Sequence, residues 1–329
     1  MKNEAITNFA DTAELLADDI NLDFQIPWFM RIDYKNDPRY LALPPEISHL
    51  ADQFMRDGFI VIPNEIDTSY IDGIVTDFRD FCFRNKDYFD PFRDEYGFLH
   101  RIINLHLAMP GLVELFSSAK NVLSLQDALF GAPTSIYTSL YYERGSAQSI
   151  HRDTPYFTTR PEYCYFGTWF ALEDADSKNG CLEVIPGGHL VKEVNRLDFA
   201  KKINGLSDVG SINQVLFDSY QEEVLNACHS KGLKSVHVPM KKGDVLIWHP
   251  QLPHGGGQIT DRTRTRNSIV MHTVPEGCPV YQAYAFFNPA LDLPGISPWP
   301  MKRGSGRAYA KHDAIEVMHQ SPRAANSFV

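Results

Sequence analysis

From about residue 135 the chain consists of short segments rich in β-branched and aromatic residues, bounded by glycine, proline or Asn-Gly. Asn179-Gly180 and Pro186-Gly187-Gly188 are strong tight-turn signals. Helical patterns do not alternate with these segments one for one, which favours an antiparallel barrel or jelly roll over a parallel α/β sheet. The predicted strands are residues 134–144, 163–172, 181–187, 234–240, 244–249 and 266–274.

Before this β region the chain carries helical patterns. Residues 46–57 have apolar positions at helical spacing and stop at Gly58, a good C-terminal signal. Residues 59–63 are predicted to form a strand, and two further helices are expected within 66–83 and 111–131. The fold class is therefore mainly β, with N-terminal helices flanking a jelly-roll core.

The chain shows no internal repeat and no Gly/Ser linker, so one elaborated domain is the simplest partition. Within the β region, residues 191–230 are predicted to be a helical insertion. We expect an N-terminal extension over 1–45, the main domain over 46–290, and a C-terminal surface tail over 291–329.

Composition excludes several classes of function. The net charge of −10 and the absence of a basic stripe argue against nucleic-acid binding. No run approaches the roughly 18 apolar residues of a membrane span, and the acidic N-terminus resembles neither a secretory nor a transit peptide. Five scattered cysteines without a CxxC pair are typical of reduced thiols. We expect a cytoplasmic protein that acts on a small molecule.

His151-Arg152-Asp153 ends an extended segment. Residues i and i+2 of a strand point to the same face, so the imidazole and the carboxylate can converge on one metal ion. His254, after an apolar strand and before three glycines, is the best third ligand, and His249 is its competitor. Two histidines and one carboxylate form the facial triad of non-haem iron(II) oxygenases, which leaves positions open for a co-substrate and dioxygen.

A second element lies on the strand that follows. Arg266 and Ser268 share a strand face with Val270 and His272. An arginine inside a barrel requires an anionic partner, and a dicarboxylate such as 2-oxoglutarate would supply one, with the serine hydroxyl alongside. Arg264 has the same parity and is the alternative anion-binding residue.

Three stretches of the sequence resemble the phytanoyl-CoA dioxygenase family of iron(II)- and 2-oxoglutarate-dependent oxygenases. They are HRDTPYF, TWFALEDADSKNGCLEVIPGGHL, and GDVLIWHPQLPHGGG followed by RTRNSIVMH. The resemblance covers residues 48 to 275 and implies a double-stranded β-helix. It implies that His151, Asp153 and His254 bind iron(II), that Arg266 holds 2-oxoglutarate, and that Trp169 lines the co-substrate pocket.

The sequence also departs from that family. Gly256 stands where the family often has a serine that assists 2-oxoglutarate binding, and ERGSAQSIHRD replaces the usual Pro-Gly approach. Gln148 in that stretch is a candidate to hydrogen-bond the co-substrate or the substrate. Asp153 favours hydroxylation, because halogenating relatives have a small residue there. The substrate candidates are Tyr141, Tyr156, Arg160 and Arg101.

The expected activity is hydroxylation of an unactivated C–H bond in a small-molecule, sugar or lipid-derived substrate, with release of succinate and carbon dioxide. One alternative is a cupin-type metalloenzyme that does not use 2-oxoglutarate, for which Arg266 and Ser268 would have no purpose. Another is a non-catalytic β-sandwich that binds glycans, which has no reason to combine His-x-Asp, a distal histidine and an inward arginine.

Overall fold

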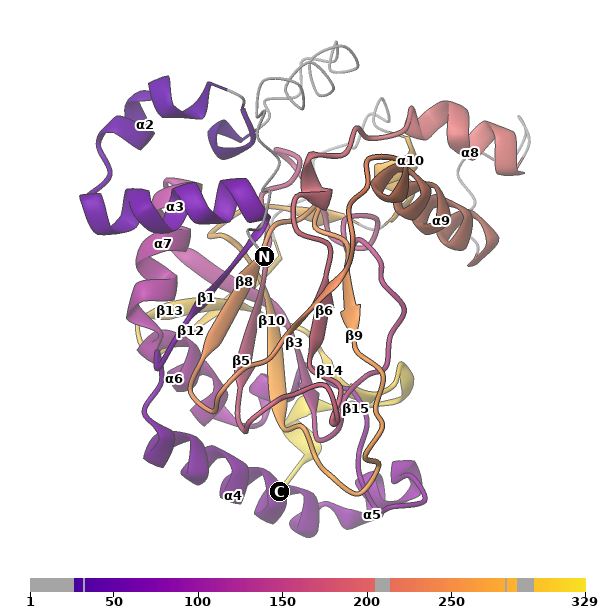
Figure 1. Ribbon diagram of the computed structural model, residues 1–329. Helices are drawn as coiled ribbons and strands as arrows, with labels where there is room; N and C mark the ends of the chain where they lie inside the picture. Colours follow the sequence, from indigo (N-terminus) through magenta and orange to yellow (C-terminus); the bar gives the residue numbers. More distant parts are fainter. Residues whose placement is uncertain (1–26, 32, 205–213, 282, 289–298) are drawn as a thin grey trace.

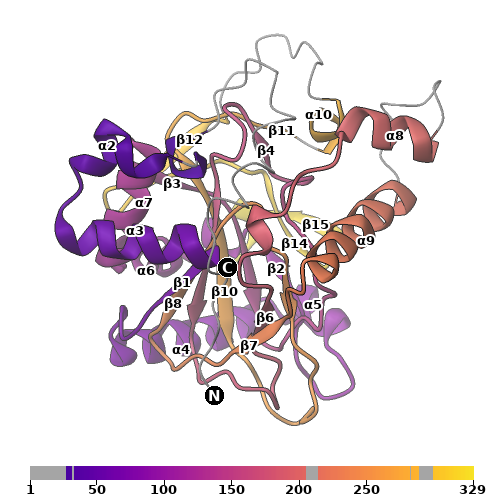
Figure 2. The same cartoon turned by 45° about the horizontal axis from the view of Figure 1, so that its top comes forward.

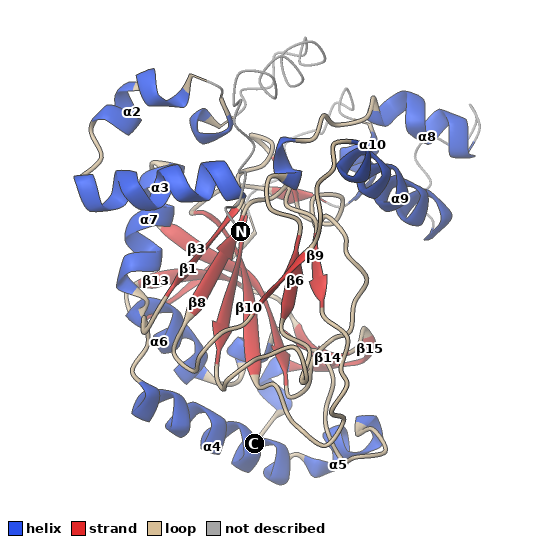
Figure 3. Cartoon of the chain, in the orientation of Figure 1, coloured by secondary structure: helices blue, strands red, loops and turns tan. Residues whose placement is uncertain are grey.

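The computed structural model describes residues 27–329 except 32, 205–213, 282 and 289–298. In this part of the chain, a large, mainly antiparallel sheet faces a smaller one, and helices surround both (Figure 3). The arrangement is a double-stranded β-helix, or jelly roll, as the sequence predicted. The predicted helices in 46–57 and 66–83 are confirmed, and the helical region of 111–131 is divided into two helices.

The strands are β1 (Phe59–Ile62), β2 (Ile102–Ile103), β3 (Thr134–Tyr142), β4 (Thr158–Thr159), β5 (Phe166–Ala171), β6 (Leu182–Val184), β7 (Val236–Val238), β8 (Val245–Trp248), β9 (His254–Gly256), β10 (Ser268–Pro275), β11 (Val280–Tyr281), β12 (Met301–Gly304), β13 (Arg307–Ala310), β14 (Ala314–Val317) and β15 (Gln320–Ala324). The large sheet has the order β1-β8-β5-β10-β3-β2-β14-β15, with β13 joined to β3 and β12 to β13. The smaller sheet is β7-β6-β9, and β4 pairs with β11.

Helix α4 begins and helix α3 ends at an ordinary capping signal. Asp67 accepts hydrogen bonds from the backbone N–H groups of Ser69 and Tyr70 at the start of α4, and Gly58 ends α3 with φ of 79°. The α-helices are α2 (Pro38–Leu41), α3 (Pro45–Asp57), α4 (Thr68–Arg84), α5 (Lys86–Phe89), α6 (Pro110–Ser118), α7 (Lys120–Phe130), α8 (Arg196–Asn204), α9 (Gln214–Ser230) and α10 (Ala283–Phe287).

The side chains of β10 point alternately into two separate hydrophobic cores. Ile269 and Met271 pack into the core that includes residues of α3, α4, α6 and α7, whereas Val270 packs with Trp169 and Trp248 between the sheets. Successive side chains of a strand point to opposite faces, so the even-numbered positions of β10 face the smaller sheet. Figure 2 shows that sheet in front of β10, with α9 beside it. The functional site lies on this inner side.

The C-terminal part of the chain differs from the prediction. Residues 301–324 form strands, and β14 pairs with β2 while β13 touches β3, so this segment is not a surface tail (Figure 1). Ile315 and Val317 are fully buried. Strands β14 and β15 extend the large sheet beyond β2, whereas β13 and β12 branch from β3. The prediction was wrong because these strands are short and pair with segments about 200 residues earlier.

The described part of the N-terminal extension is also packed against the domain. Trp28 and Phe29 are 2% exposed, and the Trp28 indole N–H donates to the Leu129 carbonyl oxygen at 2.8 Å. Residues 1–26 of the predicted extension lie outside the described residues. Among the helices that are described, none is long and apolar enough to cross a membrane.

Candidate iron and co-substrate site

His151 and His254 are brought together by a β-bridge between the segment before β4 and strand β9. The His151 N–H donates to the His254 carbonyl oxygen at 2.8 Å, and the reverse bond measures 3.0 Å. Asp153 lies two residues after His151. Its Oδ1 is 3.3 Å from His151 Nε2, and its Oδ2 is 3.4 Å from His254 Nε2. One ligand atom from each residue lies within 4.8 Å of the others, so the three can bind one metal ion.

Backbone carbonyls orient both imidazoles. His151 Nδ1 lies 2.7 Å from the Ser149 carbonyl oxygen, and His254 Nδ1 lies 2.9 Å from the Leu252 carbonyl oxygen. A carbonyl oxygen only accepts, so each Nδ1 carries the proton. The lone pair of each Nε2 therefore faces the Asp153 carboxylate. Such outer hydrogen bonds fix the tautomer of histidines that bind metals.

Two further side chains hold Asp153 on its Oδ2 side. Trp248 Nε1 donates to this oxygen at 3.2 Å, and His272 Nε2 lies 3.0 Å from it. Burial would raise the pKa of Asp153, but the neighbouring His254 and His272 imidazoles hold it well below its usual value. Burial would likewise lower the pKa of His151, but Asp153 raises it. Asp153 is thus an anion in a polar cluster, as a ligand for a divalent cation must be.

The structure separates His249 from this cluster. Its ring packs 5.8 Å from Phe54 and 4.9 Å from His189, on the side of the N-terminal helices. Its Nδ1 accepts the Gln251 N–H at 3.1 Å, and burial lowers its pKa well below the usual value. His249 is therefore a neutral histidine of the core. The geometry of the cluster favours His254 over His249 as the third ligand.

Sequence reasoning gave no role to Trp248 or His272. Strand alternation predicted that His272 shares a face with Arg266. Nothing in the sequence connected Trp248 or His272 to Asp153. Gly167 makes room for the Trp248 ring, because a Cβ at this glycine would overlap the indole. The site therefore depends on a glycine one strand away.

We expect Gly167→Ala to lower the free energy of unfolding by about 1–3 kcal/mol, the usual cost of overpacking a core. The displaced indole would also lose its bond to Asp153, so affinity for Co(II) should fall. Urea unfolding and metal titration measure the two effects. Gly73→Ala is the matched control, because no atom lies within 4 Å of a Cβ at this position of α4. It should raise stability by roughly 0.5–1 kcal/mol, and equal behaviour of the two variants would contradict the prediction.

Arg266 is buried at the inner wall, 3% exposed. Its guanidinium donates to the Gly180 carbonyl oxygen and lies 5.3 Å from the Trp169 ring centre and 5.9 Å from that of Tyr142. Among the described residues no carboxylate lies within 4 Å of it, and its buried Nε has no hydrogen-bond partner. Burial lowers its pKa to about 10. A buried cation without a counter-ion fits the distal carboxylate of 2-oxoglutarate.

Arg264 is placed differently. It forms an ion pair with Asp176 at 2.9 Å and is partly exposed. Its charge is already compensated at the surface, so it does not compete with Arg266 for an anion in the cavity. The geometry therefore favours Arg266 over Arg264.

At Gly256 the co-substrate region differs from the family pattern. A Cβ at Gly256 would collide with the Ser146 hydroxyl, so Ser146 takes the space that a serine at 256 would need.

A cavity of about 1140 Å³ contains the cluster and Arg266. Of the predicted residues, Gln148, Trp169, Tyr156 and Arg101 also line it. Ser268 does not, and its hydroxyl donates to the Arg266 carbonyl oxygen at 3.3 Å. The described residues of α9 form another wall of the cavity. This wall comes from the predicted helical insertion.

Two substrate candidates lie elsewhere. The Tyr141 ring stacks on Phe78 with 4.1 Å between centres, and its hydroxyl donates to Asn267 Oδ1. Its neighbour Tyr142 faces the cavity instead, because adjacent residues of β3 point to opposite faces. Arg160 pairs with Glu162 at 2.9 Å and does not line the cavity. Neither Tyr141 nor Arg160 is placed to touch a substrate, so both assignments are corrected.

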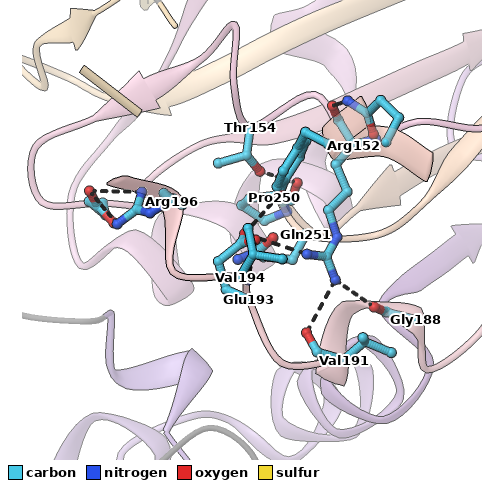
Figure 4. A network of polar contacts seen from close by, with 12 residues as sticks. Arg152, Thr154, Gly188, Val191, Glu193, Val194, Arg196, Pro250 and Gln251 are labelled. Atoms are coloured by element: carbon cyan, nitrogen blue, oxygen red, sulfur yellow. Dashed lines mark hydrogen bonds and ion pairs between the residues drawn. The ribbon is translucent and has the colours of Figure 1, made fainter. Parts of the chain in front are cut away.

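The middle residue of the His-x-Asp motif is fixed by the helical insertion. Gln221 of α9 accepts the Arg152 N–H at 2.8 Å and donates to the Arg152 carbonyl oxygen at 3.0 Å. The fully buried Arg152 guanidinium donates to the carbonyl oxygens of Gly188 and Val191 and lies 3.5 Å from Glu193 (Figure 4). Both the backbone and the side chain of Arg152, which lies between His151 and Asp153, are thus held in place.

We expect Gln221→Ala to weaken Co(II) binding about tenfold, as loss of an outer hydrogen bond at a metal site does. The reason is that the peptide groups between His151 and Asp153 would lose both side-chain bonds. Equilibrium titration of the protein with Co(II), followed by its visible absorption, measures the affinity. Asn226→Ala, at an exposed position of the same helix, is the control. Unchanged affinity in Gln221→Ala would show that α9 does not position the ligands.

Comparison with known proteins agrees with this geometry. The family model for phytanoyl-CoA dioxygenase (PhyH) matches residues 54–266. The peroxisomal phytanoyl-CoA dioxygenase of Bos taurus is 28% identical over 166 residues, 50% of this chain and 43% of the relative. That of Mus musculus is 30% identical over 146 residues, 44% of this chain and 37% of the relative. The matches thus span less than half the length of these relatives.

Solved structures share the fold. The non-haem α-ketoglutarate-dependent epimerase SnoN from nogalamycin biosynthesis has a TM-score of 0.56 at 18% identity, covering 81% of this chain and 98% of that one. EctD from S. alaskensis, with 2-oxoglutarate and 5-hydroxyectoine, has a TM-score of 0.53 at 18% identity, covering 69% and 76%. The family match extends over most of the jelly roll and includes His151, Asp153, His254 and Arg266. The chain belongs to the phytanoyl-CoA dioxygenase family of iron(II)- and 2-oxoglutarate-dependent oxygenases.

Proposed function

We propose that this protein is an iron(II)- and 2-oxoglutarate-dependent dioxygenase that hydroxylates a C–H bond of a small-molecule, sugar or lipid-derived substrate and releases succinate and carbon dioxide. The observation that carries the proposal is the presence of two incomplete sites in one cavity. One is a set of two histidines and an aspartate with convergent ligand atoms. The other is a buried arginine with no carboxylate within 4 Å among the described residues.

Each side chain then has a definite task. His151, Asp153 and His254 would hold iron(II), and Arg266 would bind the distal carboxylate of 2-oxoglutarate. When bound, the iron and the co-substrate supply the oxidising chemistry that the protein itself lacks. Trp169 and Val270 provide an apolar wall beside Arg266, which excludes water from the charged contact and strengthens it. Gln148 and Ser146, which lie against β9, add polar groups to the lining of the cavity.

The absorption spectrum of the anaerobic complex tests this proposal. Iron(II) and 2-oxoglutarate added together to the purified protein should give a weak visible charge-transfer band, and neither should give it alone. Admission of air should then release succinate. A folded protein that binds iron(II) without developing the band would favour a metalloenzyme of cupin type that does not use 2-oxoglutarate. Arg266 argues against that alternative, because such an enzyme needs no buried site for a second carboxylate.

We also propose where the protein works and how it is divided. All five cysteines are free thiols, as a reducing compartment such as the cytoplasm favours. Residues 46–290 are proposed as the oxygenase domain, to which the C-terminal strands β12–β15 add an edge. These strands are relevant to the site, because the cavity is also lined by His312 and His319 from this segment.

A further inference from the structure

The floor of the cavity is built from rows of side chains across the large sheet. In the register of β5, β10, β3 and β2, the residues Trp169, Val270, Leu140 and Ile103 are neighbours. All four line the cavity. They form a continuous apolar row that begins beside Arg266 and ends at β2. The part near Arg266 suits the carbon chain of 2-oxoglutarate, which leaves Leu140 and Ile103 for another molecule.

Arg101 lies at the far end of this floor. It precedes Ile103 by two residues, so it shares the inner face, and extension of the β2–β3 register places it opposite Tyr142. The Arg101 carbonyl oxygen accepts the Met318 N–H at 2.9 Å. The C-terminal strands therefore hold the backbone of Arg101 in place. Tyr142 is near both arginines, because the Arg266 guanidinium lies 5.9 Å from its ring centre and Arg101 acts on its hydroxyl.

The charge of Arg101 has no counter-ion in the described part of the chain. No carboxylate there lies within 4 Å of its guanidinium, although the side chain is half-buried and lines the cavity. Burial raises the pKa of Tyr142, and Arg101 and Arg266 both oppose that rise. Burial lowers the pKa of His319, Arg101 lowers it further, and Glu316, whose carboxylate lies 3.9 Å from His319 Nδ1, raises it. Arg101 is the cation at this end of the cavity, and Glu316 is not among the residues that line it.

The two arginines come from different strands of the floor. Arg266 leads into β10 and Arg101 leads into β2, with β3 between them. Neighbouring strands lie about 4.8 Å apart, so the backbones of the two arginines are roughly 10 Å apart across the floor. If Arg266 binds the distal carboxylate of 2-oxoglutarate, Arg101 remains available for a second anion on the substrate side.

The opposite wall carries the opposite charge. Asp218 and Glu222 of α9 line the cavity across from the floor. Tyr156 lies between the two sides. Burial raises its pKa first, Asp218 raises it further, and Arg101 lowers it. An anionic group would be repelled from α9 and attracted to Arg101, which confines it to one end of the cavity.

We propose that Arg101 is the substrate-anion receptor of this enzyme, and that the substrate carries a carboxylate or phosphate group on an apolar body that lies over Leu140 and Ile103. The inference rests on the proposed function, because it assigns Arg266 to 2-oxoglutarate. It narrows the substrate class from any small molecule to amphiphilic organic anions. Neutral sugars are excluded by it.

Calorimetric binding to the anaerobic enzyme, loaded with iron(II) and 2-oxoglutarate, tests this inference. The probes are octanoate, octyl phosphate and octanamide, which share an apolar chain and differ in charge. The wild type should bind at least one of the two anions about tenfold or more tightly than the amide, which is the usual effect of a charged hydrogen bond. The tighter of the two anions identifies the head group as carboxylate or phosphate.

Arg101→Gln should remove the preference for anions, and Arg101→Lys should retain part of it. Arg262→Gln is the matched control, since this arginine is exposed and lies 3.7 Å from Glu95 outside the cavity. Equal binding of acid and amide by the wild type, no binding of any probe, or an anion preference that survives in Arg101→Gln would overturn the inference. The visible band of the wild-type complex reports separately on the proposed function, so the two can fail independently.

Discussion

Asp153→Ala is expected to abolish 2-oxoglutarate turnover and to reduce affinity for iron(II) or Co(II) more than about a hundredfold, beyond the range seen for outer hydrogen-bond partners. The variant keeps both imidazoles but loses the only anionic ligand of the set. It also leaves Trp248 Nε1 and His272 Nε2 without their shared acceptor. That loss should lower the free energy of unfolding by about 1–3 kcal/mol. Succinate release, Co(II) titration and urea unfolding measure the three quantities.

Asp153→Asn separates ligation from packing. The amide keeps an oxygen that can accept from Trp248, so stability should be closer to that of the wild type, while the negative charge that attracts a divalent cation is gone. Asp174→Ala is the matched control, because this aspartate is exposed and pairs with Lys241 at 2.8 Å. If Asp153→Asn and Asp174→Ala bind Co(II) with equal affinity, the cluster is not the metal site.

Local patterns were sufficient to predict the jelly roll and most of this site. The helical periodicity that stops at Gly58 and the two-residue spacing of His151 and Asp153 both depend on neighbours in sequence. The structure shows the expected helix end and the expected convergence. Arg266 was also within reach, because alternation along one strand places it on the inner face with His272. In each case the relevant geometry is set within a few residues.

The features that sequence reasoning missed depend on contacts between distant segments. Strands β14 and β2 pair although more than 200 residues separate them, and each is too short for its own pattern to be informative. The bond from Trp248 to Asp153 and the clamp of Gln221 on Arg152 likewise join separate segments. The prediction that Tyr141 faces the substrate was wrong. Most residues on both faces of β3 are buried, so polarity does not reveal which face of this strand is the inner one.

Those long-range contacts change what the site can do. The candidate metal site of His151, Asp153 and His254 is surrounded by three parts of the fold, namely the β-bridge, the helical insertion and the large sheet. The C-terminal strands add Arg101's backbone partner and His319 to the rim. Local motifs therefore define the reaction class, whereas the non-local packing of α9 and β14 defines the space that a substrate enters. Variation in those two elements is where we expect specificity to be altered without loss of the metal site.

Arg266→Ala is expected to raise the KM for 2-oxoglutarate by about tenfold to a hundredfold, the cost of a lost charged hydrogen bond. Without 2-oxoglutarate, loss of the Arg266 charge should not lower the free energy of unfolding. The reason is that burial already disfavours the charged guanidinium. Saturating 2-oxoglutarate should stabilise the iron-loaded wild type against urea and stabilise Arg266→Ala far less, since ligand stabilisation follows affinity. Arg264→Ala is the control, because its charge is paired with Asp176 outside the cavity. A raised KM in Arg264→Ala alone would assign the co-substrate to that arginine and leave the buried charge of Arg266 unexplained.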